Sequence, residues 1–134
     1  MDQEKQIRAF RQHSGAGVLS SSDGAGAVNA AVFGSRWELY QQHVAIALGE
    51  CRTLHNLKID GRAVYLFYTP GETLLDWQGG RLYLEAVRFE KDGELFENLV
   101  AETEQTAGRM AAGMLRCAIV FRILETRPLI DLSP

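Results

Sequence analysis

The chain has 134 residues, of which 46% are hydrophobic and 23% charged, and this composition is that of one ordinary globular domain spanning residues 1–134. With 14 basic and 17 acidic residues the net charge is −3, which excludes a general attraction for nucleic acid or for an anionic membrane surface. Cys51 and Cys117 form no C-x-x-C pair, and the charged N-terminal segment holds no apolar signal sequence. We therefore expect a cytoplasmic protein without a disulfide framework or a structural metal.

The N-terminal part of the chain is predicted to form a helix followed by a β-hairpin. Ile7 and Phe10 share one face of the helix, and the glycines of "HSGAG" end it. The segments "GVLSSS" and "AVNAAVFGS" then flank "DGAG", a glycine-rich connection typical of a hairpin. Gly24 and Gly26 also resemble the start of a dinucleotide-binding fingerprint, but a strand follows them where that motif requires a helix. We therefore set the Rossmann interpretation aside.

The middle of the chain is predicted to be strand, helix and strand. In "HVAIALG" bulky side chains alternate with alanine and glycine, so one face of this strand is small enough for another element to approach closely. "TLHNLKID" predicts a short helix with Leu54 and Leu57 facing inward. "RAVYLFYTPG" is almost continuously apolar, which is typical of a strand covered on both sides.

The C-terminal part adds two strands and a third helix. In "RLYLEAVRFEKDG" the apolar alternation changes register after Ala86, which predicts a β-bulge or a sharp coil of the strand. "GELFENLVAE" carries the apolar stripe of a helix, and "LRCAIVFRILE" returns to strand. About six strands joined mostly by short turns, with three helices, indicate a mainly β, α+β fold: an antiparallel barrel with peripheral helices.

The junction between "HVAIALG" and the following helix is the first candidate site. Backbone N–H groups at a helix N-terminus lack intrahelical partners and carry partial positive charge, so anions bind there. Thr53 can cap the helix or place its hydroxyl toward a phosphate, Arg52 offers a planar fork for two phosphate oxygens, and Asn56 can add a polar contact. The alternative is structural: Thr53 is an ordinary cap, and Arg52 faces water or pairs with Glu50.

Asn29 is the second candidate feature, because it stands among small residues in "AVNAAVFG". Ala30 and Ala31 would let a flat ring lie against the strand, with the amide of Asn29 fixing the polar edges of that ring. The alternative is that Asn29 is a structural hydrogen-bonding residue near the hairpin.

Three segments, taken in order, resemble the FMN-binding split-barrel family related to pyridoxamine 5′-phosphate oxidase: "GVLSSSDGAGAVNAAVFGS", "ALGECRTLHNLKIDGRAVYLFY" and "RLYLEAVRFEKDGELFENLVAE". They carry the hairpin with its Asn-small-small strand, the Arg/Lys-Thr-x-x-Asn-Leu junction, and a late strand followed by Asp-Gly-x-x-Phe-x-x-Leu. The resemblance covers roughly Gly15 to Leu124. It implies a six-stranded antiparallel split β-barrel with peripheral helices.

The resemblance also implies a cofactor, FMN, and a homodimer with the flavin near the interface. The implied cofactor-binding residues are Asn29, Ala30, Ala31, Leu48, Gly49, Arg52, Thr53 and Asn56. The first three would border the flavin and its ribityl chain, and the next two would supply nearby backbone. Arg52 and Thr53 would hold the phosphate, with Asn56 in support.

The catalytic residues, the substrate and the electron donor stay open at this point. The ending "RPLIDLSP" does not reproduce the arginine-containing signature of the true oxidases, so we do not expect oxidation of vitamin B6. The first hypothesis is an FMN-dependent oxidoreductase or a flavin redox protein without a metal. The alternative is a non-enzymatic module that carries or senses FMN, haem or another phosphate-bearing ligand. For haem, His43 or His55 would be the axial ligand. Cys51 is expected to be a bystander, because no base is identifiable beside it.

Overall fold

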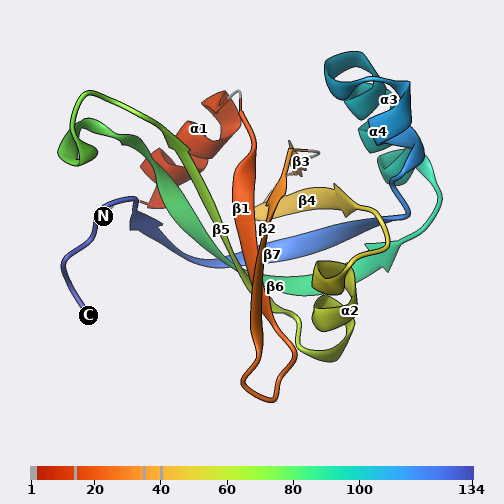
Figure 1. The fold of residues 1–134 in the computed structure, drawn as a ribbon, viewed down its shortest axis with the longest axis horizontal. Coiled ribbons are helices and arrows are strands. Elements are labelled where there is room, and N and C mark those ends of the chain that lie inside the picture. The colour runs from red at the N-terminus through yellow and green to blue at the C-terminus, as the bar shows by residue number, and fades with distance from the viewer. Residues whose placement is uncertain (1–2, 14, 35, 40) are drawn as a thin grey trace.

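The structure is a computed structural model that describes residues 3–13, 15–34, 36–39 and 41–134. The strands are β1 (Gly17–Ser22), β2 (Val28–Phe33), β3 (Arg36–Glu38), β4 (His43–Leu48), β5 (Arg62–Thr69), β6 (Gln78–Glu90) and β7 (Cys117–Pro128). The helices are α1 (Gln3–Gln12), α2 (Arg52–Ile59), α3 (Glu94–Ala107) and α4 (Arg109–Gly113), with a 3₁₀ turn at Leu74–Asp76. Within the described residues the strands form one antiparallel sheet in the order β2-β1-β5-β6-β7-β4-β3 (Figure 1).

The expected mainly β, α+β architecture is confirmed, with two short additions. β3 pairs with β4 and extends the sheet by a seventh, three-residue strand at its edge. α4 follows α3 directly after Gly108, whose φ of 96° is a backbone conformation suited to glycine. Both additions are too short to show a hydrophobic period, so the sequence carried no signal for either of them.

The sheet curls so strongly that its two ends meet. β2 contacts β4, although β1, β5, β6 and β7 lie between them in the strand order. In Figure 1, β1 and β2 run across the direction of β4 and β7. The pairing of β6 with β7 shifts register between Tyr83 and Leu84 and again between Ala86 and Arg88. The second shift confirms the predicted irregularity after Ala86, and such shifts increase the local bend and twist of a sheet.

The inner face of the curled sheet holds the main core, which α1 and α2 cover. Phe10 of α1 packs edge-on against Tyr65 and Phe67 of β5, with ring centroids 5.8 and 5.7 Å apart. Leu54 and Leu57 of α2 are each 2% exposed within the same core, as their spacing predicted. α2 is thereby seated against the hairpin formed by β1 and β2.

The outer face of the sheet is covered at one end only. Ala45 and Ala47 of β4 lie there, and Leu99 of α3 packs against them, which is the close approach predicted for the small face of this strand. At the β2 end, Val28 and Val32 are 80% and 70% exposed. β5 is buried at alternate positions and half-buried between them. The prediction that β5 is covered on both sides is therefore wrong for the described structure, because α3 lies over β4 and β7 instead.

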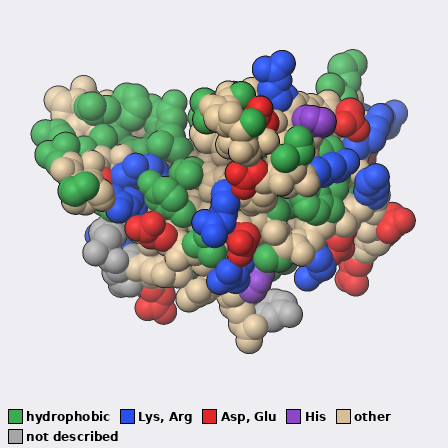
Figure 2. Space-filling view, turned by 90° about the horizontal axis from the view of Figure 1, so that it is seen from below, with side chains coloured by type: hydrophobic (Ala, Val, Ile, Leu, Met, Phe, Trp, Pro, Cys, Tyr) green, Lys and Arg blue, Asp and Glu red, His purple; other side chains and the backbone are tan. Residues whose placement is uncertain are grey.

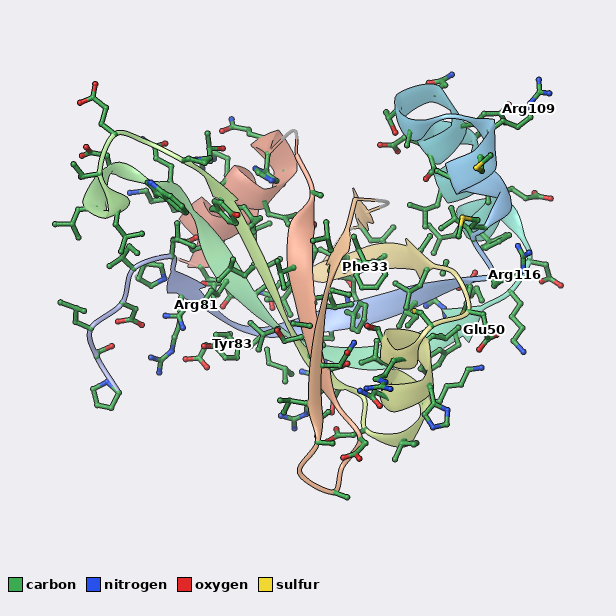
Figure 3. The ribbon with its side chains drawn as sticks, in the orientation of Figure 1. Phe33, Glu50, Arg81, Tyr83, Arg109 and Arg116 are labelled. Carbon is green, nitrogen blue, oxygen red and sulfur yellow. The ribbon has the colours of Figure 1, made fainter. Side chains whose placement is uncertain are left out.

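The segment after β7 is held against β6 by a polar cluster. Arg81 and Arg127 both donate to Oδ2 of Asp131, at 3.3 and 3.1 Å, and Arg81 also donates to the Tyr83 hydroxyl at 3.3 Å (Figure 3). Hydrogen bonds from Ser133, together with the Arg127 charge, hold the pKa of the Asp131 carboxyl below its usual range. This cluster fixes the C-terminal residues at the end of the molecule that lies away from α3.

In the described part of the chain, no helix combines the length and the apolar character needed to cross a bilayer. Figure 2 shows acidic and basic side chains interspersed over the middle of one face, with hydrophobic side chains gathered toward one end. On this face the charges thus form no continuous patch of one sign.

Candidate functional site

Two side-chain hydrogen bonds join the β1–β2 hairpin to α2. Nδ2 of Asn29 donates to Oγ1 of Thr53 across 3.0 Å, and Nδ2 of Asn56 donates to Oγ of Ser21 across 3.2 Å. Ser21 and Asn29 are direct cross-strand partners in the hairpin, while Thr53 and Asn56 lie about one turn apart on α2. One pair of opposed strand residues is thus tied to one turn of the helix.

Three of the four hydrogen-bonded residues are almost entirely removed from water, and the fourth, Asn29, is half-buried. Thr53, Asn56 and Ser21 are 1%, 4% and 5% exposed. A buried polar group is destabilising unless it has a partner, so these bonds are required for α2 to pack against the hairpin. The structure therefore brings together the predicted site residues Asn29, Thr53 and Asn56, and it gives each of them a protein partner. Ser21 completes the group and was not predicted.

The first turn of α2 has no side-chain cap. Cys51 is the N-cap residue, with extended backbone at φ −160° and ψ 170°, and its side chain makes no capping hydrogen bond. Thr53 lies inside the first turn, where its hydroxyl accepts from Asn29. The N–H groups at this end are therefore left for water or for a ligand.

Arg52 is the charged group at this end of α2. It is exposed, and it forms no ion pair or hydrogen bond with any residue that the structure describes. Glu50 is also exposed, and the Arg52–Glu50 ion pair considered as the structural alternative is not formed in the described part of the chain. The junction thus combines an uncapped helix start with a guanidinium that has no protein partner among the described residues.

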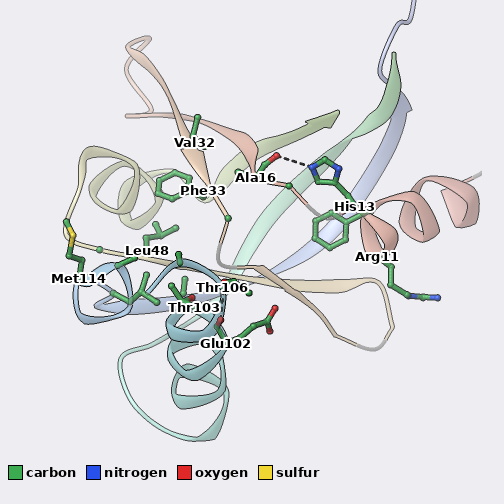
Figure 4. Close-up of a pocket in the computed structure, with 18 residues that line it drawn as sticks. Arg11, His13, Ala16, Val32, Phe33, Leu48, Glu102, Thr103, Thr106 and Met114 are labelled. Carbon is green, nitrogen blue, oxygen red and sulfur yellow. Dashed lines mark hydrogen bonds between the residues drawn. The ribbon is translucent and has the colours of Figure 1, made fainter. Parts of the chain in front are cut away.

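A groove of about 1120 Å³ begins at the end of β4, just before this junction. Its walls come from five places: the end of α1, the segment before β1, the end of β2, the end of β4, and the α3–α4 pair. Figure 4 shows Phe33 and Leu48 on its walls, with Met114 at the α4 end. The lining mixes apolar side chains with polar ones such as Glu102 and Thr106, as is common for ligand pockets.

Gly49 allows the floor of the groove to meet the end of α4. A Cβ atom placed on Gly49 would lie 2.6 Å from the carbonyl oxygen of Met114, closer than real carbon atoms approach. The backbone N–H of Arg116 donates to the carbonyl of Leu48 across 2.8 Å on the same side. The absence of a side chain at Gly49 is therefore a packing requirement of this end of the groove.

The predicted cofactor-binding residues fall into three groups in the structure. Leu48 and Gly49 line the groove. Asn29, Thr53 and Asn56 form the buried hydrogen bonds, and Arg52 lies exposed at the helix start. Ala31 is half-buried on the inner face of β2, whereas Ala30 is exposed on the outer face, because neighbouring residues of a strand point to opposite sides. Ala30 and Ala31 therefore do not share one surface.

The histidine on the groove wall is His13, which the sequence did not single out. Its Nε2 lies 3.0 Å from the carbonyl oxygen of Ala16, and its ring lies against Phe67 with centroids 5.4 Å apart (Figure 4). His43, one of the two expected haem ligands, has its Nδ1 2.6 Å from the carbonyl oxygen of Gln41, and His55 is exposed on α2. Neither of them is part of the groove lining. Among the described residues, no three His, Cys, Asp or Glu side chains gather in a way that could hold a metal ion.

No family model matches the sequence, and no curated protein matches it. Solved structures do match. An FMN-binding protein from Syntrophomonas wolfei aligns with a TM-score of 0.81 at 22% identity, over 96% of this chain and 85% of that one. HutZ, the haem storage protein of Vibrio cholerae, aligns with a TM-score of 0.66 at 20% identity, over 98% and 93% of the two chains.

A candidate pyridoxamine 5′-phosphate oxidase from Listeria innocua aligns with a TM-score of 0.71 at 15% identity, over 96% of this chain and 98% of that one. At such identities the alignments define a fold and leave the ligand and the activity to be argued from the residues. The shared architecture extends over nearly the whole chain in all three comparisons. The chain therefore has the split-barrel fold of the pyridoxamine 5′-phosphate oxidase-like and FMN-binding proteins.

Proposed function

We propose that this protein binds FMN and acts as a flavin redox protein or an FMN-dependent oxidoreductase. The observation that carries the proposal is the start of α2, where an uncapped first turn and a guanidinium, Arg52, without a partner among the described residues follow in the chain shortly after Leu48 and Gly49, which line the groove. Support comes from the Syntrophomonas wolfei structure, which has the same fold and is an FMN-binding protein.

The residues at this junction suit a phosphate monoester. Backbone N–H groups at a helix start and a planar guanidinium are both strong donors to phosphate oxygens. Thr53 would contribute through its backbone N–H, because its side chain is 1% exposed and its hydroxyl oxygen already accepts from Asn29. FMN differs from riboflavin by this phosphate alone, so the junction predicts a preference for FMN.

The groove suits the flat part of the same ligand. Phe33 supplies apolar surface to the groove, and the fully buried Leu48 and the neighbouring Gly49 complete its lining at the end of β4. When FMN is bound, the flavin supplies the electron or hydride transfer. The chain anchors the phosphate, orients the ring and limits the access of water to it. We assign no catalytic side chain.

The proposed functional unit is a homodimer that buries the uncovered outer face of the sheet. Val28 and Val32 are largely exposed there, and the half-buried side chains of Val64, Leu66 and Tyr83 continue the surface across β5 and β6. A shallow hollow of about 270 Å³, lined mostly by apolar atoms, lies on the same face. An exposed apolar surface of this kind is typical of a protein interface.

Haem is the second candidate ligand, and one observation favours it. His13 lies on the groove wall, and HutZ, which has the same fold, is a haem storage protein. An imidazole on a pocket wall is a common axial ligand for haem iron. Under this alternative the protein is a carrier, and Arg52 has no required role.

The absorption spectrum of the purified protein, followed by titration with FMN, riboflavin and haemin, tests the proposal. We expect flavin absorbance near 450 nm on the order of one FMN per chain, with FMN bound at least about tenfold more tightly than riboflavin. Bleaching by a reduced nicotinamide cofactor would identify an oxidoreductase, and a yellow protein inert to reductants would identify a carrier. A Soret band with no flavin binding would overturn the FMN assignment in favour of haem.

A further inference from the structure

We propose that Ser21 is a positioning residue for the phosphate-binding end of α2, an inference that rests on the proposed FMN function. Ser21 lies on β1, is 5% exposed, and accepts a hydrogen bond from Nδ2 of Asn56 across 3.2 Å. It has no assigned contact with the ligand and acts through Asn56 on the orientation of the helix.

The geometry of two contacts explains why Ser21 matters. The bond from Asn29 to Thr53 holds the first turn of α2 against the hairpin at one point. Leu54 and Leu57 hold α2 in the core through apolar contacts, which have no directional preference, and two polar contacts about one turn apart fix the orientation of the helix against the hairpin. The Asn56–Ser21 bond is the second contact. Ser21 and Asn29 are cross-strand partners in the hairpin. Both contacts therefore attach α2 to the same pair of opposed strand residues.

The direction of the helix axis determines where the first-turn N–H groups point. No side chain caps these N–H groups, so they are available to donate to a ligand. Loss of the Ser21 hydroxyl leaves a buried amide of Asn56 without its acceptor, and α2 must then shift to rehydrate that amide. We therefore expect the phosphate-binding geometry to change while the apolar groove, which other elements form, stays intact.

The test compares Ser21→Ala with Ser22→Ala in the full chain. Ser22 follows on the same strand, and its hydroxyl accepts from the backbone N–H of Gly24 at the hairpin tip across 3.0 Å. Each variant thus loses one accepting hydroxyl, and Ser21 is the one that bonds to α2. FMN and riboflavin affinities are measured by titration. Hydrogen exchange of the His55 amide, which donates to the carbonyl of Cys51 across 3.1 Å in the first turn of α2, is measured without ligand.

For Ser21→Ala we expect FMN affinity to fall about two- to tenfold, riboflavin affinity to change less than about twofold, and exchange of the hydrogen-bonded His55 amide to accelerate. Ser22→Ala should leave all three unchanged. A residue with a purely structural role would lower both affinities together or neither of them. An unchanged ratio of FMN to riboflavin affinity in folded Ser21→Ala would therefore overturn the positioning role.

The same measurements distinguish a failure of the FMN proposal from a failure of the inference about Ser21. If the wild-type protein binds neither FMN nor riboflavin, the FMN proposal fails, and the role assigned to Ser21 in phosphate binding fails with it. If the wild-type protein prefers FMN but Ser21→Ala keeps that preference and normal amide exchange, only the inference about Ser21 is lost.

Discussion

The side-chain amide of Asn29 donates to the hydroxyl of Thr53 across 3.0 Å, and this bond joins two segments that are 24 residues apart in the chain. From the sequence, each of these two residues could either bind a ligand or make a structural hydrogen bond. The structure shows that both residues have a structural role, because Thr53 is 1% exposed and its partner lies on the hairpin. A role in ligand binding would therefore act through backbone and through Arg52 more than through the amide of Asn29.

Replacing Thr53 by valine should destabilise the protein. Thr53→Val keeps the side-chain shape but leaves the Asn29 amide without its acceptor, so the free energy of unfolding should fall by about 1–3 kcal/mol. Denaturant unfolding measures this value. Thr106→Val is the control, because the Thr106 hydroxyl is exposed and donates to Glu102 within its own helix, and its effect should stay within about 0.5 kcal/mol. Equal losses in the two variants would contradict a stabilising role for the Asn29–Thr53 bond.

Replacing Arg52 by alanine should weaken FMN binding without affecting the fold. Arg52 is exposed and has no described protein partner, so Arg52→Ala should leave the unfolding midpoint unchanged. Loss of a charged contact to phosphate should reduce FMN binding by about 1–3 kcal/mol, with riboflavin binding unaffected. Lys58→Ala removes an exposed positive charge near the other end of α2 and serves as the control. If the two variants bound FMN equally well, the phosphate would have to lie elsewhere.

The outer-face valines should control assembly. Val28 is 80% exposed, so Val28→Lys should not disturb the monomer fold but should place a charge in the proposed interface. We expect light scattering after size-exclusion chromatography to show a dimer for the wild type and a shift toward monomer for the variant. Met110→Lys, at an 84% exposed position on α4, should remain dimeric. A monomeric wild type would remove the homodimer from the proposal.

The elements with a clear local period were predictable from the sequence. In β4, Val44 and Ile46 face the main core while Ala45 and Ala47 face α3, as the alternation of large and small residues indicated. The sequence could not identify α3 as the element that covers Ala45 and Ala47, because α3 is far from β4 in the chain and their contact depends on the tertiary fold. The prediction that β5 is covered on both sides failed for a related reason. An apolar residue looks the same in the sequence whether its side chain is fully buried or half-buried on an outer face.

The sequence predicted only a small part of the groove, namely Leu48 and Gly49. Phe33, His13 and Met114 line the same cavity but come from three distant segments, and none of them was predicted as a site residue. Ser21 left a weak signal, since it is a polar residue at an inward position of a strand. The sequence could not show which residue bonds to this buried hydroxyl, and only the structure identifies Asn56 as its donor.

The two glycines near α4 should respond to alanine in opposite directions. A Cβ at Gly49 would lie 2.6 Å from the Met114 carbonyl oxygen, so Gly49→Ala must displace backbone and should reduce the free energy of unfolding by about 1–3 kcal/mol. Nothing lies within 4 Å of a Cβ at Gly113, so Gly113→Ala should stabilise α4 by up to about 1 kcal/mol. Thermal unfolding measures both. A neutral Gly49→Ala would show that the end of α4 is not packed on the groove floor.

The C-terminal segment should loosen at low pH. Hydrogen bonds from Ser133, with the charge of Arg127, hold the pKa of Asp131 below its usual value of 3.8. A carboxyl group with a lowered folded-state pKa stabilises the structure above its unfolded pKa, and this contribution is lost as the pH falls through the folded value. The contacts of Asp131 with Arg81 and Arg127 should therefore be complete at pH 7 and weaken only below pH 3.8.

Backbone ¹⁵N relaxation of Leu132 and Ser133 checks this pH dependence. At pH 7 these two amides should be rigid in the wild type and mobile in Asp131→Asn, because the neutral amide cannot replace a carboxylate that accepts from two guanidinium groups and from Ser133. As the pH falls well below 3.8, the wild type should approach the mobility of the variant, since its carboxyl then becomes neutral as well. Asp92→Asn, which changes an exposed aspartate in the turn before α3, should not alter the mobility of the C-terminal segment at either pH. A C-terminal segment that is equally rigid in the wild type and in Asp131→Asn at pH 7 would show that the backbone contacts of Arg81 and Arg127 hold it without the carboxylate.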